Sequence, residues 1–271
     1  MKKIYYSLAC CLIGGMLASC GGGAKKSNAT EEAAAPTTTA VSYSKSLKAP
    51  ETDSLNLPID ADGYITIFDG KSLDGWRGYG KDKVPSRWII EDGCLKFCGT
   101  GTGEGQTGEG GDLIFAHKFK NFELSVDWKT SKMGNSGIFY YVREVPGKPI
   151  YYAAPEVQVL DNVDATDNKL ANHLAGSLYD MLPADPKTVN PAGEWNTIVI
   201  RVKDGKVTHT QNGKKVVEYT LWSKEWDDLV ANSKFKNFPG FTEGISKEGY
   251  IGLQDHGYPI WFRNIKIREL K

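Results

Sequence analysis

Residues 196–219 read NTIVIRVKDGKVTHTQNGKKVVEY, and this stretch decides the fold class. It contains three runs of apolar and alternating residues, which are separated only by Asp204-Gly205 and Asn212-Gly213. Alternation with a period of two is typical of strands, and Asp-Gly and Asn-Gly pairs favour two-residue hairpin turns. The stretch therefore predicts three consecutive antiparallel strands with no helix between them.

The same pattern recurs along the rest of the chain. Further strand-like runs lie at 64–68, 88–91, 94–98, 112–115, 122–129, 136–143, 156–160, 250–254 and 260–268. Because these runs follow one another without intervening helices, we expect an all-β sandwich and not a βαβ fold.

One short helix and one long loop interrupt this series of strands. The helix is predicted at 224–235, where Ser223 can cap the first turn and Trp226, Leu229 and Val230 form an apolar stripe. The segment 164–190 has no clear periodicity and is long for a loop. Since long ordered loops in compact domains are usually functional, we expect this one to border the site.

The N-terminus predicts export and lipid anchoring. Residues 1–19 combine a basic start with an apolar stretch too short to span a membrane, as in a secretory signal peptide. The segment Leu17-Ala18-Ser19-Cys20 resembles the lipobox of bacterial lipoproteins, which implies lipidation of Cys20. Residues 20–60, poor in aromatic side chains, are expected to form a flexible tether before a domain at 61–271. We therefore expect a protein lipid-anchored in the cell envelope, periplasmic or at the outer membrane.

Composition and the absence of several motifs limit the function. The chain has 33 Lys and Arg residues and 33 Asp and Glu residues, so no basic excess indicates a nucleic-acid partner. No His-Glu-x-x-His, paired Cys-x-x-Cys or Gly-x-Ser-x-Gly motif occurs, which disfavours zincins, zinc ribbons and serine esterases. In an extended strand Cys94 and Cys98 would lie about 13 Å apart, beyond the roughly 7 Å limit for a disulfide, so both should be free thiols.

The first candidate site lies in residues 155–161, which read PEVQVLD. Glu156 and Gln158 are two positions apart, so in a strand they share one face at a spacing of about 6 to 7 Å. A carboxyl group and an amide at that distance suit a polyhydroxylated ligand. The alternative is ordinary solvent exposure on an outer sheet face.

Two other segments could contribute to the same site. Gln254, Asp255 and His256 end a strand immediately before a Gly-bounded turn, where Asp255 could orient His256 as a general base or metal ligand. Asn135 precedes a strand that carries Arg143 on the predicted face of its aromatic residues, a combination that suits a sugar ring. The alternatives are a turn-capping Asp with a surface His, and a structural ion pair of Arg143.

These motifs, in their order and spacing, resemble the 3-keto-disaccharide hydrolase domain family. The resemblance covers about 65–270 and is carried by 68–76 (FDGKSLDGW), Trp88 with 91–93 (EDG), 135–138 (NSGI), 156–161 (EVQVLD), 193–196 (GEWN), 212–213 (NG), 252–257 (GLQDHG) and 262–265 (FRNI). It implies a concanavalin A-like or LamG-like jelly roll. It also implies a carbohydrate substrate already oxidised at C3 by a partner oxidoreductase.

The implied chemistry needs a base, an enolate stabiliser and help for the leaving group, because a C3 ketone acidifies the C2 proton and permits β-elimination at C1. We expect Glu156 or His256 as the base and Asp255 as its orienter. Arg143 or a divalent cation is expected to stabilise the enolate. The expected substrate contacts are Gln158, Asn135, Asp161 and Gln254. Asp161 is the weakest of these because strand alternation directs it away from Glu156 unless a bulge intervenes.

Two other function classes compete with the enzyme. A non-catalytic carbohydrate-binding module of the same fold needs aromatic residues and amides but no base. A structural surface domain needs no cleft with convergent polar groups. The distinguishing feature is whether His256 and Glu156 meet in one cavity of sugar size.

Overall fold

The stretch 196–219 forms the predicted antiparallel series. In the computed structural model it comprises β9 (Asn196–Lys203), β10 (Lys206–Gln211) and β11 (Lys214–Thr220), each paired antiparallel with the next. Both residues of each intervening turn have positive φ angles, from 48° to 81°. That is the backbone of a type I′ hairpin turn, which explains the Asp-Gly and Asn-Gly pairs.

The structure describes residues 55, 57–101 and 109–271. The predicted signal peptide, the lipidation site Cys20 and most of the predicted tether lie outside the described residues. No helix in the part of the chain that is described is long and apolar enough to cross a membrane.

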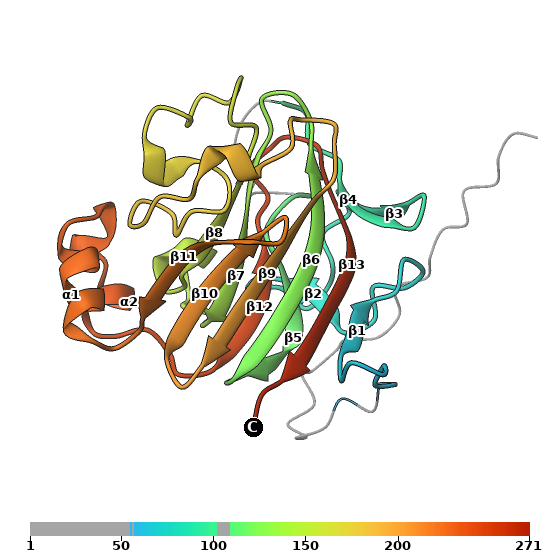
Figure 1. Ribbon diagram of the computed structural model, residues 1–271. Coiled ribbons are helices and arrows are strands. Elements are labelled where there is room, and N and C mark those ends of the chain that lie inside the picture. The colour runs from blue at the N-terminus through green and yellow to red at the C-terminus, as the bar shows by residue number, and fades with distance from the viewer. Residues whose placement is uncertain (1–54, 56, 102–108) are drawn as a thin grey trace, which may run out of the picture. The chain divides into compact units, whose positions relative to one another are not determined.

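The larger of two sheets has eight strands, and β9, β10 and β11 form one end of it (Figure 1). Their order is β11-β10-β9-β6-β13-β4-β3, with β1 paired to β13. The remaining members are β1 (Ile65–Phe68), β3 (Trp88–Glu91), β4 (Cys94–Phe97), β6 (Phe122–Thr130) and β13 (Ile260–Glu269). All of the pairings are antiparallel.

The smaller sheet has five strands in the order β2-β5-β12-β7-β8. They are β2 (Trp76–Gly78), β5 (Leu113–Phe119), β7 (Asn135–Val142), β8 (Glu156–Leu160) and β12 (Gly249–Leu253). An apolar core packs between the sheets, and β8 contributes Val157, Val159 and Leu160 to it. The predicted all-β jelly-roll sandwich is confirmed.

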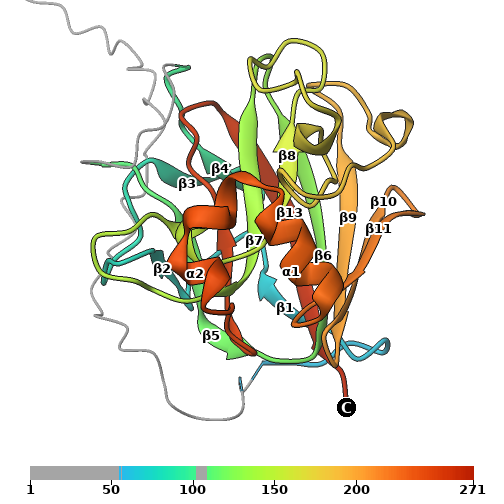
Figure 2. The ribbon, with the colours of Figure 1, turned by 90° about the vertical axis from the view of Figure 1, so that its left-hand side faces the viewer.

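Two short α-helices lie at one edge of the sandwich (Figure 2), where α1 contacts β11. Helix α1 (Lys224–Ala231) begins at the predicted cap, because the Ser223 side chain accepts a hydrogen bond from Trp226 N. It ends four residues earlier than predicted, because Ser233 caps a new 3₁₀ turn, η4 (Lys234–Asn237). Helix α2 (Pro239–Thr242) follows, so the prediction of a single helix was wrong.

The loop after β8 contains two 3₁₀ segments and runs along the free edge of that strand. It includes η2 (Ala171–His173) and η3 (Pro186–Thr188), while η1 (Ile150–Tyr152) precedes β8. Gly176 N and Tyr179 N donate hydrogen bonds to carbonyl oxygens of β8. The backbone of the loop thereby satisfies an edge strand that would otherwise be exposed.

The two cysteines of the domain are free, as predicted. Burial raises the pKa of both thiols, so neither has the character of an activated nucleophile.

Candidate active site

A cavity of about 250 Å³ lies on the face of the smaller sheet that points away from the core. It is lined by Asn135, Tyr151, Glu156, Gln158, Asp167, Tyr179, Lys234, Phe238, Gln254 and His256. Five of these ten residues are site residues predicted from the sequence, drawn from three separate strands or strand ends. The volume lies below the roughly 300–1,000 Å³ of pockets for drug-sized ligands, so one sugar ring suits it better than a long oligosaccharide.

Glu156 is the buried carboxyl group of this cavity. Strand alternation directs Val157 into the core and Glu156 to the opposite face, where the side chain is only 5% exposed. Burial raises the pKa of Glu156 to about 8, while the positive charges of Lys234 and His256 oppose the increase. At neutral pH the protonated form therefore predominates, so this group can donate a proton.

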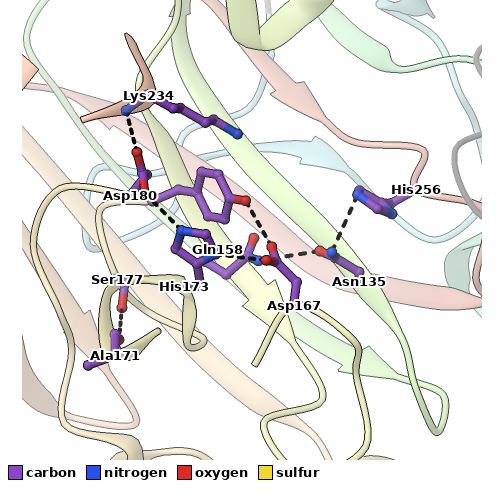
Figure 3. A network of polar contacts seen from close by, with 10 residues as sticks. Asn135, Gln158, Asp167, Ala171, His173, Ser177, Asp180, Lys234 and His256 are labelled. Carbon is purple, nitrogen blue, oxygen red and sulfur yellow. Dashed lines mark hydrogen bonds and ion pairs between the residues drawn. The ribbon is translucent and has the colours of Figure 1, made fainter. Parts of the chain in front are cut away.

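A chain of amides connects β8 to His256 (Figure 3). Gln158 Nε2 donates to Asn135 Oδ1 at 3.4 Å, and Asn135 Nδ2 lies 3.4 Å from His256 Nε2. With the Asn135 oxygen used as an acceptor, its NH₂ group faces the imidazole. This arrangement favours the tautomer in which His256 Nε2 carries no proton, as a general base requires.

Two buried amide oxygens in the cavity accept no hydrogen bond from the described residues. Gln158 is 1% exposed and Gln254 is 4% exposed, and neither Oε1 atom has a hydrogen-bond partner among the described residues. A buried acceptor without a partner is costly, and a ligand rich in hydroxyl groups would satisfy both oxygens. Tyr151 and Phe238 add aromatic surface to the same lining, which suits the CH groups of a sugar ring.

The long loop contributes a polar cluster around His173 (Figure 3). His173 Nδ1 lies 2.7 Å from Asp167 Oδ1, and Nε2 lies 2.9 Å from Asp180 Oδ1. Asp167 Oδ2 accepts a hydrogen bond from Tyr179 Oη at 2.8 Å, and Asp180 Oδ2 accepts one from Lys234 N at 2.6 Å. Through Asp167 and Tyr179 the long loop borders this cavity.

Asp255 occupies a different place from the one predicted. Its side chain is fully buried, and its carboxylate accepts backbone hydrogen bonds from Gly111 N at 2.8 Å and Gly257 N at 2.9 Å. It is not part of the cavity lining. Asp255 thus fixes the turn on which His256 sits.

Arg143 and Asp161 were predicted to contact the substrate, and neither lines the cavity. Arg143 is exposed and lies just after the end of β7. The prediction relied on strand alternation, and Tyr141, with a φ of 54°, breaks that alternation. The buried Asp161 accepts hydrogen bonds from Met133 N at 2.8 Å and Val163 N at 3.1 Å. It therefore joins two loops, as the alternation of β8 had already suggested.

Metal ligands do not cluster in the part of the chain that is described. No group of three or more His, Cys, Asp or Glu side chains lies close enough there to hold a metal ion. A divalent cation therefore stays a prediction from the sequence, to be tested with a chelator.

The profile of the 3-keto-alpha-glucoside-1,2-lyase-like domain family matches residues 63–268, a range that includes every residue of the cavity lining. The chain belongs to this family. A curated relative from Bacteroides thetaiotaomicron is named 3-keto-disaccharide hydrolase. It is 57% identical over 290 aligned residues, and the match covers 100% of this chain and 100% of the relative.

Two solved structures from Parabacteroides distasonis, each named "putative glycosyl hydrolase", share the fold. One is 32% identical with a TM-score of 0.69, and the match covers 78% of this chain and 95% of the other. The second is 29% identical with a TM-score of 0.61, covering 76% and 99%.

Half of the cavity lining in this 3-keto-alpha-glucoside-1,2-lyase-like domain was not predicted from the sequence. The missed residues are Tyr151, Asp167, Tyr179, Lys234 and Phe238. The length of the loop was the available signal for Asp167 and Tyr179. Lys234 had no such signal, because the sequence places it in the last turn of a predicted helix.

Proposed function

We propose that this protein is a glycoside-cleaving hydrolase that acts on 3-keto-disaccharides in the cavity around Glu156. The observation that carries the proposal is the convergence of Glu156, from β8, and His256, from the turn after β12, on one cavity of sugar size. Family membership and the name of the Bacteroides thetaiotaomicron relative support the substrate class. The unpaired oxygens of Gln158 and Gln254 support a ligand with many hydroxyl groups.

In the proposed first step, His256 Nε2 removes the proton from C2, which is acidified by the C3 ketone. The electron pair of the C–H bond forms the enolate. As the C3 carbonyl re-forms, a double bond forms between C1 and C2 and the bond from C1 to the glycosidic oxygen breaks. Glu156, neutral because burial raises its pKa to about 8, donates its proton to the departing oxygen.

The second step returns both groups to their starting state. The Glu156 carboxylate takes a proton from water as the water oxygen adds to C1 of the enone. The protonated His256 returns a proton to C2. The sum is hydrolysis of the glycosidic bond, and the 3-keto sugar is released with a free C1 hydroxyl group. One carboxyl group and one imidazole suffice, so the two carboxyl groups of an ordinary glycosidase are not required.

The substrate requires a preceding reaction. A disaccharide carries a hydroxyl group at C3, so a partner oxidoreductase must remove two electrons and two protons before this chemistry can begin. We also propose that Cys20 is lipidated and tethers the protein in the cell envelope, because residues 17–20 match a lipobox. Labelling of the wild type with a fatty acid, together with loss of the label in Cys20→Ala, would support the anchor.

The test of the proposed activity uses a 3-keto-disaccharide and its unoxidised parent, each with and without chelator, and follows sugar release. We expect release from the keto sugar and none from the parent. Binding of both sugars with similar affinity but without cleavage would favour a carbohydrate-binding module. Loss of cleavage in chelator, with recovery on adding a divalent cation, would establish metal dependence.

A further inference from the structure

We propose that Lys234 is a further catalytic residue, whose ammonium group binds the C3 oxygen of the substrate and stabilises the enolate. This inference rests on the proposed function, because the enolate forms only if the C2 proton is removed. The predicted stabiliser, Arg143, lies outside the cavity lining. Positive charge at the developing oxyanion must therefore come from another group.

Lys234 is the one Lys or Arg side chain among the described residues that line the cavity. Its Nζ atom lies 4.1 Å from the ring centre of Tyr179 and 5.5 Å from that of Tyr151. Aromatic faces attract an ammonium group without neutralising it. Within the described part of the chain, Lys234 has no ion-pair partner, so its charge remains available to a ligand.

The backbone of Lys234 is held by the cluster around His173 (Figure 3). Asp180 accepts a hydrogen bond from the backbone N–H of Lys234 and also contacts His173. On its other side His173 contacts Asp167, which holds the Tyr179 hydroxyl group. One chain of contacts therefore positions both the backbone of Lys234 and the ring of Tyr179, which its ammonium group contacts.

Lys234 and His256 reach the cavity from separate elements, Lys234 from η4 and His256 from the turn after β12. A sugar between them could present its C2–H to the imidazole and its C3 oxygen to the ammonium group. The charge of Lys234 also acts on Glu156, where it is the largest influence opposing the effect of burial. Lys234 is therefore close enough to influence charge within the cavity.

Lys236 provides a matched control, because it lies in the same 3₁₀ turn, is exposed and is absent from the cavity lining. Cleavage of the 3-keto-disaccharide and binding of its unoxidised parent would be measured for Lys234→Met and Lys236→Met. We expect Lys234→Met to lower kcat by about 10² to 10³-fold, the usual loss for one oxyanion donor. Binding of the parent should change less than about threefold, because no oxyanion develops on it.

Lys236→Met should match the wild type in both measurements, and thermal unfolding would verify that each variant is folded. In Lys234→Ala, added ethylammonium should restore part of the lost kcat. Near-normal kcat in Lys234→Met, or equal losses of parent binding and turnover, would overturn the role of Lys234 while leaving the proposed function intact. Failure of the wild type to cleave the keto sugar would overturn both.

Discussion

Gly137 leaves the space that the Glu156 carboxyl group occupies: a methyl group on Gly137 would lie 2.1 Å from Glu156 Oε1. The two residues face each other from neighbouring strands, since Gly137 pairs with Gln158 and Phe139 with Glu156. The φ angle of Gly137 is not in the left-handed region, so the backbone alone does not require glycine. The requirement comes from the carboxyl group above it.

Gly137→Ala should therefore lower both stability and activity by displacing Glu156. Overpacking of this kind costs typically 1–3 kcal/mol. A double-mutant cycle measured by urea unfolding would identify the cause, because the cost of Gly137→Ala should largely disappear in a Glu156→Ala background. An equal cost in both backgrounds would mean that the glycine serves the backbone and not the carboxyl group.

The raised pKa of Glu156 predicts that the free energy of unfolding decreases as pH rises. Burial raises this pKa from 4.5 to about 8, so between these values the folded protein holds a proton that the unfolded chain releases. This contribution is fully present below about pH 4.5 and is lost as pH rises through about 8. The charged side chains that act on Glu156 are Lys234, His256, Asp112 and Asp167.

Glu156→Gln should remove this dependence, since the amide cannot ionise. Relative to the wild type, its free energy of unfolding should improve from pH 5 to pH 9 by up to a few kcal/mol, at about 1.4 kcal/mol per pKa unit. Urea unfolding at several pH values measures this, with the exposed Glu243→Gln as the control. A constant difference between Glu156→Gln and the wild type across the range would contradict the raised pKa.

His256→Ala should lower turnover of the keto sugar by at least about 10²-fold, the usual loss for a general base. His117→Ala is the matched control, because His117 lies on β5, contacts Glu269 at 3.6 Å and does not line the cavity. Rates would be measured at saturating and at low substrate. Near-normal kcat in His256→Ala would remove the imidazole from the proposed role.

Much of the sandwich could be predicted because hairpin turns and strand alternation are local signals. The Asp-Gly and Asn-Gly pairs specify positive φ angles, and the series from β9 to β11 follows from them. Strand β2 could not be found this way, since it has three residues and forms by pairing with β5. The end of α1 was also missed, because Ser233 favours a new turn over continued helix.

The residues of the candidate site were likewise predictable only where a local signal in the sequence exists. Glu156 and Gln158 were predictable, because both line the cavity while Val157 and Val159 between and after them pack into the core. The position of Arg143 was wrong because the register between β7 and β12 shifts near Tyr141, which reverses the faces beyond that point. Lys234 depends on contacts between η4 and a loop more than fifty residues away, which no local pattern in the sequence encodes.

Asp161 should matter for stability and Arg143 for neither stability nor catalysis. Asp161→Ala leaves the backbone amides of Met133 and Val163 without their acceptor, which should cost about 1–3 kcal/mol. The kcat/KM of the folded protein should stay within about threefold. Arg143→Ala, at an exposed position, should match the wild type in both unfolding and kinetics. A large loss of kcat/KM in Arg143→Ala would return it to the site.

His173 should act as a positioning residue through Lys234. In His173→Leu the carboxylates of Asp167 and Asp180 lose the imidazole between them, so the backbone of Lys234 and the ring of Tyr179 are less firmly held. We expect kcat for the keto sugar to fall about tenfold with little change in binding of the unoxidised parent, since a 1 Å misplacement can cost up to about 10²-fold.

A double-mutant cycle separates this role from a general loss of stability. In a Lys234→Met background, His173→Leu should lower kcat little further, because the group that it positions is already absent. Lys169→Gln, an exposed substitution in the same loop, should leave kcat unchanged in both backgrounds. Losses of kcat that simply multiply would show that His173 supports the site by a route independent of Lys234.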